Sequence, residues 1–310
     1  MFNKALLSFS ILFLLFTFAC KDKPADPGVI EYEIKNKPGF MMRITDQGQE
    51  PRKLLKFNFS QGATQKGKMI MDMDIQNEMN GSSSPLVVMP SIIMPMRSTV
   101  EKVDENGTAT IKYDISGVTV KAREGSNPQL VSSLEGLYNK ITLISCTGDI
   151  DPFGAGAKPE CEFEGDIEPS LAGSVKQIME NSNNIVFVPE HPVGVGAKWE
   201  ISSQGMESGG IMVSFKSSQE LVKLDGDTAT IDTTFIQGAD EQTVQFPGNN
   251  FKTKIESLRG EGSSKMEIDL NELFPTGQAG SKTNVTTIIQ MPDSENKVVT
   301  NMDMNIKFTE

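Results

Sequence analysis

A single histidine, His191, limits the nucleophilic chemistry that this chain could carry out. A Ser-His or Cys-His pair needs an imidazole, and His191 is the only one among 310 residues. It lies between Pro189 and Pro192 and just before two glycines, so the segment predicts a turn that leads into a strand near Trp199. A lone histidine in a turn favours an exposed surface residue, and Trp199 favours a core anchor. We therefore predict that the protein is not an enzyme.

Pairs of aspartates are the remaining candidates for metal binding. Two aspartates separated by one residue lie on the same face of a strand and could chelate Ca²⁺, which takes several oxygen ligands. The chain has three such pairs: Asp72 and Asp74, Asp149 and Asp151, and Asp225 and Asp227. None of them continues into a calcium-loop pattern, which favours solvated faces and turn caps over metal ligands. We predict no metal site and no cofactor.

The first 19 residues have the features of a secretory leader. Lys4 precedes an apolar run, Ala5–Ala19, which ends abruptly at Cys20 and is followed by charged residues and prolines. The run of 15 residues is shorter than the roughly 20 residues that a helix needs to cross a membrane. A basic start, a short apolar segment and a small residue before the break indicate a signal peptide over residues 1–19.

Ala19 and Cys20 at the end of this leader resemble the lipobox of bacterial lipoproteins. Thr17 stands where that family usually has Leu, which is similar to the relaxed boxes of spirochaete lipoproteins. The resemblance implies that the Cys20 thiol is acylated and becomes the mature N-terminus, followed by a tether over residues 20–28. It also implies an exported, lipid-anchored protein of the cell envelope, on the periplasmic or surface face of the outer membrane. An ordinary cleaved leader with a stray cysteine is the alternative.

Composition argues against two classes of partner. The chain has 29 basic and 41 acidic residues, for a formal net charge of −12. Nucleic-acid binding needs clustered Lys and Arg, and docking on anionic lipid needs a basic patch, so neither is expected. Attachment to a membrane would depend on the acyl chains at Cys20, and stable anchoring takes more than one of them.

Two further cysteines, Cys146 and Cys161, are 15 residues apart in a segment rich in Gly, Pro and Asp. In an exported chain the simplest arrangement of two remaining cysteines is a disulfide. A thiolate metal site is the alternative, but two thiols need further ligands and His191 is distant in sequence. We predict a Cys146–Cys161 disulfide.

Strict alternation of apolar and polar residues predicts antiparallel strands with one dry and one solvated face. It is clearest over residues 53–59, 68–76 and 297–308. Residues 86–96 are apolar without alternation and contain two prolines, so we expect an edge segment or a loop there.

Two predicted hairpins have nearly the same sequence. Residues 102–111 read KVDENGTATI and residues 223–231 read KLDGDTATI, with turn residues in the middle of each. This indicates an internal duplication, with one β-rich repeat over residues 29–125 and a second over residues 186–310. Chance recurrence of Asp/Gly hairpins is the alternative.

Two helices are predicted between these repeats, in an insertion over residues 126–185 that also holds the cysteine pair. Asn127 and Pro128 suit a helix start. The apolar stripe that follows consists of Leu130, Leu134, Leu137 and Ile141. Pro169 begins the second helix, whose stripe consists of Leu171, Val175 and Ile178.

The predicted fold is mainly β, with two helices in the middle. A sheet this large curls, so its dry face closes on itself and on the helices. We expect a large antiparallel, strongly curved sheet or half-barrels, which resembles in architecture the open-barrel carriers of lipids and lipoproteins in bacterial envelopes. Residues 192–199 (PVGVGAKW) resemble the Pro-Val-x-Val-Gly-x-x-Trp strand start of bacterial lipoproteins with domains of unknown function, which implies no activity.

Methionine is unusually frequent, with 17 residues. Five of them are predicted to point to the dry face of the sheet: Met69, Met71, Met73, Met302 and Met304. Methionine adapts to irregular partners, so these residues form either core filler, which we favour, or a concavity that suits acyl chains.

The sequence thus predicts a non-catalytic structural or interaction module that its lipid anchor holds at a membrane. The alternative is a carrier or sensor that binds a hydrophobic ligand, a lipid or an acyl chain, in the methionine-rich concavity. The expected partners are a membrane and either a protein or a lipid ligand, and nucleic acid is not expected.

Overall fold

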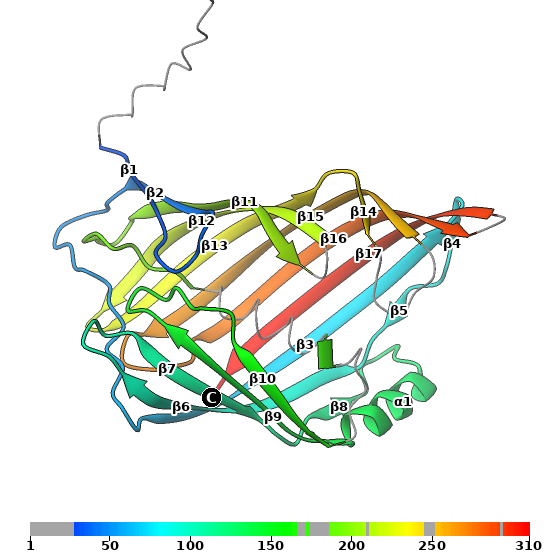
Figure 1. Cartoon of the computed structure of the whole chain (residues 1–310), viewed down its shortest axis with the longest axis horizontal. Helices are drawn as coiled ribbons and strands as arrows, with labels where there is room; N and C mark the ends of the chain where they lie inside the picture. The colour runs from blue at the N-terminus through cyan, green and yellow to red at the C-terminus, as the bar shows by residue number, and fades with distance from the viewer. Residues whose placement is uncertain (1–27, 166–171, 174–185, 209–210, 245–251, 292–293) are drawn as a thin grey trace, which may run out of the picture.

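The computed structural model describes residues 28–165, 172–173, 186–208, 211–244, 252–291 and 294–310. The predicted signal peptide, Cys20 and nearly all of the predicted tether lie outside these residues. The described residues form one large antiparallel sheet with a single α-helix at its side (Figure 1).

The described part of the chain contains seventeen strands. In the first half they are β1 (Ile30–Glu33), β2 (Phe40–Asp46), β3 (Thr64–Met79), β4 (Ser82–Ser83), β5 (Val87–Val88), β6 (Ser91–Val103), β7 (Ala109–Ile115), β8 (Thr119–Lys121) and β9 (Ile141–Ile150). In the second half they are β10 (Glu160–Gly165), β11 (Lys198–Ser208), β12 (Ile211–Asp225), β13 (Thr228–Ala239), β14 (Gln242–Val244), β15 (Lys252–Asp269), β16 (Thr276–Met291) and β17 (Ser294–Thr309). The helix α1 (Pro128–Tyr138) lies between β8 and β9 in the chain.

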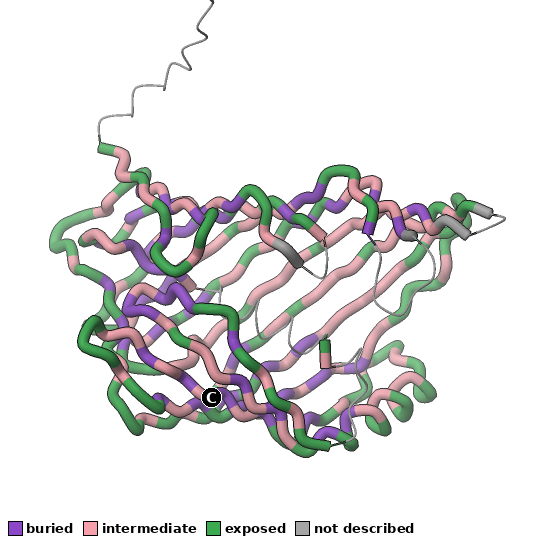
Figure 2. Tube along the Cα trace, in the orientation of Figure 1, coloured by how far each residue is buried: buried purple, intermediate pink, exposed green. Residues whose placement is uncertain are grey.

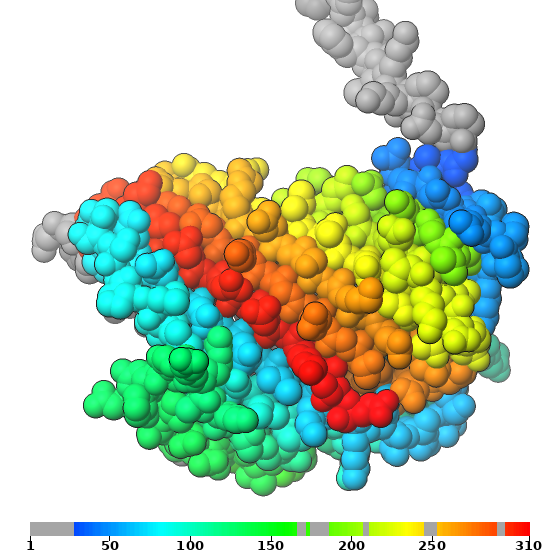
Figure 3. All heavy atoms as spheres, turned by 180° about the vertical axis from the view of Figure 1, so that it is seen from behind, coloured from blue at the N-terminus to red at the C-terminus, as the bar shows by residue number. Residues whose placement is uncertain are grey.

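The strand pairings place the long strands in the order β10-β9-β7-β6-β3-β17-β16-β15-β13-β12-β11-β2-β1, with every pair antiparallel. The short strands β4, β5, β8 and β14 pair with parts of β3, β6 and β15. Because β10 and β1 are edges, the sheet is not closed. β3 pairs with β17 and β2 pairs with β11, so both predicted repeats contribute to one sheet, and Figure 3 shows β17 between β16 and β3.

The sheet is strongly curved. The evidence is that a single hydrophobic core includes residues near both of its edges. That core includes Met42 on β2 and Ile111 on β7, which lie nine strand positions apart in the sheet. In a flat sheet with about 4.8 Å between strands, these residues would be about 43 Å apart. In Figure 1 the edge strand β10 lies in front of the central strands, and the other edge strand, β1, lies at the upper left. We call the face that carries the core the inner face.

Loops fill the space between the two ends of the curved sheet. Residues 53–59, predicted to be a strand, form only one isolated bridge, from Lys53 to Val193. Buried and exposed residues do alternate along this segment. They alternate because the segment crosses the core, and not because it pairs with a neighbouring strand. Phe57 is buried there, and its N–H donates to the Pro152 carbonyl at 2.9 Å. Many buried residues lie where these loops cover the sheet, in the left part of Figure 2.

The α1 helix begins where the sequence predicts, and the Asn127 side chain caps it by accepting the N–H of Gln129 at 2.8 Å. It ends at Tyr138, so Ile141, predicted as the last residue of the apolar stripe, instead begins β9 and is buried in the sheet. The described residues contain one helix where two were predicted. The second, from Pro169, falls outside the described residues except for residues 172–173.

Pro95 lies inside β6, a strand with neighbours on both sides, although the sequence predicts an edge segment or a loop there. Proline lacks the N–H that a ladder needs. On one side of β6 the pairing with β8 ends at Ile93 and the pairing with β7 begins at Met96. On this side Pro95 falls between the two ladders, where no N–H is needed, whereas on the other side it lies opposite Lys68 of β3.

Candidate ligand-binding pocket

The five methionines predicted to share a dry face do lie on one face of the sheet. β3 and β17 pair with Met73 directly opposite Met304, and directly opposite residues point to the same face. Met69 and Met71 are buried in the core, whereas Met73, Met302 and Met304 are half-buried. The set is therefore divided between core filler and partly exposed surface.

A pocket of about 100 Å³ lies between the inner face and the loops that cover it, and none of these five methionines lines it. Aromatic rings form much of its wall: Phe57, Phe59, Tyr113, Phe274 and Phe308. Met96 and Ile111 line the same space from β6 and β7. We call this site the aromatic pocket.

The rings of the aromatic pocket come from segments that are distant in sequence. Phe57 and Phe59 follow β2 and stack on each other, with ring centroids 5.5 Å apart. The intervening Asn58 N–H donates to the Leu270 carbonyl at 2.7 Å, which ties this segment to the end of β15. Tyr113 on β7 contacts Phe274 with ring centroids 5.9 Å apart. Curvature of the sheet brings these segments together.

One side chain, Gln65 on β3, fixes the wall segment that contains Phe274. Its Oε1 accepts the N–H groups of Leu273 at 2.7 Å and Phe274 at 2.8 Å. Its Nε2 donates to Glu272 Oε2 at 2.8 Å. Hydrogen bonds of this kind contribute about 1 kcal/mol each. The three bonds of Gln65 therefore hold residues 272–274 in place on this side of the pocket.

Tyr113 brings a hydroxyl to the otherwise apolar wall. Only 6% of the residue is exposed, and burial raises the pKa of its phenol above the usual value. Among the described residues no hydrogen-bond partner reaches this hydroxyl. Ser98 lies directly opposite Tyr113 on β6, and its buried Oγ has no partner in the described part of the chain either.

His191 is half-buried rather than exposed as predicted, because its ring packs edge-on against Tyr32 with centroids 5.5 Å apart. The Tyr32 hydroxyl accepts the Glu190 N–H at 2.8 Å, and burial raises the pKa of Tyr32 to about 12. Trp199 is 1% exposed, which confirms the prediction of a core anchor. His191 therefore has a packing role at the covered end of the sheet, away from the wall of the aromatic pocket.

The aspartates of the predicted pairs make ion pairs and turn contacts. Asp74 pairs with Arg123 at 2.8 Å, and Asp227 pairs with Lys53. Across the described ranges, no group of three or more His, Cys, Asp and Glu side chains is arranged to hold a metal ion.

Asp151 is the buried member of these pairs, and it makes stability depend on pH. Burial raises the pKa of its carboxyl, whereas the N–H groups of Phe153 and Ala155, at 2.8 and 2.9 Å, oppose the rise. The Asn36 side chain also opposes it, and the Glu190 carboxylate adds to it. Because the folded chain holds this proton more tightly than the unfolded chain, stability is lost as pH rises through the pKa of folded Asp151.

We expect Asp151→Asn, which keeps an acceptor for both amides, to gain stability relative to wild type on going from pH 4 to pH 7. Urea unfolding at the two pH values measures the difference. Asp149→Asn, which removes an exposed carboxylate two residues earlier, near the end of β9, is the control. If the free energy of unfolding changed equally with pH in wild type and Asp151→Asn, ionisation of Asp151 would not destabilise the fold.

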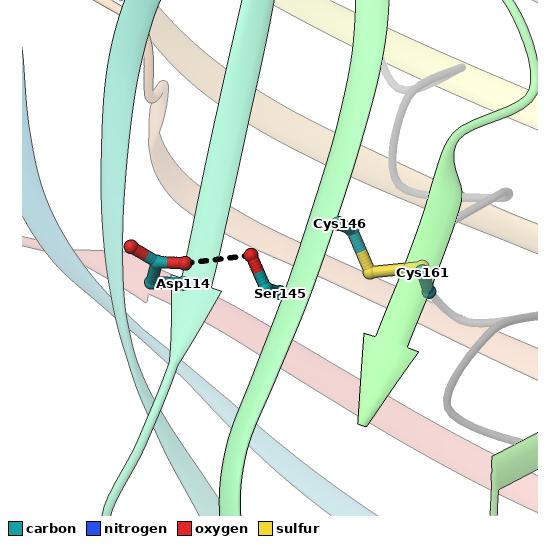
Figure 4. Close-up of a disulfide and its surroundings, with 4 residues drawn as sticks. All are labelled: Asp114, Ser145, Cys146 and Cys161. Atoms are coloured by element: carbon teal, nitrogen blue, oxygen red, sulfur yellow. Dashed lines mark hydrogen bonds between the residues drawn. A yellow bond between two sulfur atoms is a disulfide. The ribbon is translucent and has the colours of Figure 1, made fainter. Parts of the chain in front are cut away.

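The predicted disulfide is present between Cys146 on β9 and Cys161 on β10, with an S–S distance of 2.07 Å (Figure 4). The two residues are directly opposite each other in the antiparallel pair. On the other side of β9, Ser145 Oγ donates to Asp114 Oδ1 at 2.9 Å. The disulfide therefore ties the edge strand β10 to the rest of the sheet.

Removing both cysteines as Cys146→Ala/Cys161→Ala should lower the free energy of unfolding by about 3 kcal/mol, since the bond closes a loop of 15 residues. Alanine avoids placing a hydroxyl at the fully buried position 146. Urea unfolding of the variant and of wild type, each with and without reductant, measures the loss. Reductant should destabilise wild type and leave the variant unchanged. If reductant also destabilised the variant, its effect on wild type could not be assigned to the Cys146–Cys161 bond.

Within the described residues, no helix has the length and apolar character needed to span a membrane. The comparison with curated proteins gave no match. Residues 172–275, which include β11 to β15, match DUF6263, a family of unknown function.

Proposed function

We propose that the mature protein is anchored in the bacterial cell envelope through acylated Cys20 and binds a hydrophobic ligand there without converting it, as a carrier or sensor. The observation that supports this function is the aromatic pocket. Small-molecule sites are concave and largely apolar, with a few polar groups that fix orientation. The aromatic pocket combines five rings, Met96 and Ile111 with the single hydroxyl of Tyr113.

The volume of the pocket limits the ligand. An engineered apolar cavity of roughly 150 Å³ binds benzene, and the aromatic pocket has about 100 Å³. We therefore assign it a compact ligand or the compact end of a larger one, and the half-buried Met73, Met302 and Met304 lie outside it.

An interaction module is the second candidate, and a groove on the other face of the sheet favours it. This groove, of about 840 Å³, is lined by Leu86 and Ile236, which are 55% and 59% exposed. Exposed apolar side chains beside charged ones suit a protein partner.

The internal duplication remains our explanation for the two similar hairpins, whose strands β6–β7 and β12–β13 pair in the same antiparallel manner.

Native mass spectrometry of the soluble body from Lys21 onward, without the leader and Cys20, separates the two functions. The hydrophobic core extends from Ile34 to Phe308, so this chain contains all of it. We expect a bound hydrophobic compound that denaturation releases, in an amount close to one per chain. A chain that carries no such compound and takes up none from an envelope extract would refute the carrier or sensor and leave the interaction module.

The anchor has its own test. Cys20→Ala should abolish incorporation of a labelled fatty acid and should move the protein from the membrane fraction to the soluble fraction, because one thiol is the only acceptor that the lipobox offers. Cys146→Ala/Cys161→Ala is the control, since it leaves the proposed acceptor in place. Persistent labelling of the Cys20→Ala variant would show that our interpretation of the leader is wrong.

A further inference from the structure

We propose that the aromatic pocket selects a compact, uncharged group with one hydrogen-bond acceptor, and that the Tyr113 hydroxyl donates to that acceptor. The inference rests on the proposed function and specifies its ligand class. A ketone, ester or ether oxygen on a small apolar frame has this chemistry.

The unpaired hydroxyl of Tyr113 is the first argument. Buried polar groups in folded proteins nearly always have a partner, and an exception calls for an explanation. Tyr113 lines the aromatic pocket, is 94% buried and has no partner among the described residues. The Tyr113 hydroxyl is not among the fully buried unpartnered atoms, so a ligand group in the pocket can reach it. A ligand that supplies the partner explains why the hydroxyl is there.

The composition of the wall decides the charge of the ligand. Among the described residues that line the pocket there is no Lys, Arg or His, so a buried carboxylate or phosphate would lack a counter-charge. The single carboxylate of the wall, Glu272, is exposed and accepts a hydrogen bond from Gln65. Aromatic faces attract a quaternary ammonium group, but such a group offers no acceptor to the Tyr113 hydroxyl, and a primary ammonium buried there would lose its hydration. An uncharged group avoids both costs.

The same wall favours an acceptor over a donor. A phenol hydroxyl either donates a hydrogen bond to a given neighbouring atom or accepts one from it. A carbonyl or ether oxygen that accepts from Tyr113 leaves no donor of its own unpaired. An alcohol or amide would bury an additional O–H or N–H. The rings and aliphatic side chains of Phe57, Phe274 and Ile111 cannot accept it, and the carboxylate of the wall, Glu272, lies at the exposed rim and already accepts from Gln65.

A matched pair of probes tests this inference on the soluble body from Lys21 onward. Cyclopentanone and cyclopentane have the same frame and differ in one carbonyl. Their dissociation constants are measured by following the methyl signals of Met96 and Ile111 by NMR. We expect Tyr113→Phe to weaken cyclopentanone about 5- to 10-fold, the value of one net hydrogen bond, and to leave cyclopentane unchanged. Tyr138→Phe is the matched control, because Tyr138 is also buried but lies on α1 outside the pocket.

The outcomes separate the inference from the function beneath it. Equal changes for both probes, or an unchanged affinity for cyclopentanone in Tyr113→Phe, would overturn the inference and leave a hydrophobic pocket in place. Failure of wild type to bind either probe would overturn the proposed function as well. A second measurement needs no variant: the ¹³C signal of the cyclopentanone carbonyl should shift downfield when bound to wild type. A bound carbonyl with the shift it has in hydrocarbon solvent would contradict the hydrogen bond.

Discussion

Trp199→Ala should lower the free energy of unfolding by about 3–5 kcal/mol, the range for removing a large aromatic side chain from a core. Trp199 is 1% exposed and lies on β11, directly opposite Ile44 on β2 and Gln219 on β12. Its ring therefore fills the junction where the first strands of the chain join the second half of the sheet. Urea unfolding followed by circular dichroism measures the loss, since the variant lacks the tryptophan fluorescence of the chain.

Trp199→Phe is the matched control and should cost clearly less than Trp199→Ala. Phenylalanine keeps an aromatic ring in the core and removes the indole N–H, and the buried Nε1 of Trp199 has no hydrogen-bond partner in the described residues. No bond is therefore lost with it. A loss below about 1 kcal/mol for Trp199→Ala would be typical of a surface substitution and would contradict the core position of this residue.

Ile111→Ala should destabilise the fold by about 2–5 kcal/mol and enlarge the aromatic pocket at the same time. Ile111 is fully buried on β7 and lines the pocket. The space that the variant opens adds to the existing cavity, so benzene should bind there and restore part of the lost stability. The rise in the unfolding free energy follows the ratio of free benzene to its dissociation constant. Thermal unfolding with and without benzene measures the rescue.

Ile115→Ala provides a close control for that experiment. Ile115 is on the same strand and the same face as Ile111 and is also fully buried, but it does not line the pocket. It should lose a similar amount of stability and gain less from benzene. Equal rescue of both variants would mean that benzene fills any new cavity in this core, and the aromatic pocket would have no special access to ligands.

Alternation of residue types predicted the strands well where a strand is solvated on one side. Residues 68–76 and 297–308 fall within β3 and β17, and the two similar hairpins are β6–β7 and β12–β13. Residues 53–59 show the limit, because a segment that crosses a core alternates in the same way as one that pairs in a sheet. Pro95 shows a second limit, because a gap between two ladders cannot be read from one strand alone.

The candidate site could be predicted only in part. Alternation placed the five methionines on one face, but their burial depends on loops whose course the sequence does not specify. The aromatic pocket was missed because its residues come from separate segments, with Phe57 after β2, Tyr113 on β7 and Phe274 before β16. The closely spaced Phe57 and Phe59 were the available signal. What they would face depends on the curvature of the sheet, which is a property of all the strands together.

The central claim is that the protein contains an apolar pocket that a ligand can enter. Crystals of the soluble body from Lys21 onward under xenon pressure test this claim most directly. Xenon occupies dry apolar cavities that are open to it. We predict an electron-density peak for xenon within the wall formed by Phe57, Tyr113 and Phe274, and a weaker or displaced peak in a variant that fills the space, Ile111→Phe. Unchanged density in the pocket of wild type, with side chains closed over the space, would contradict the claim.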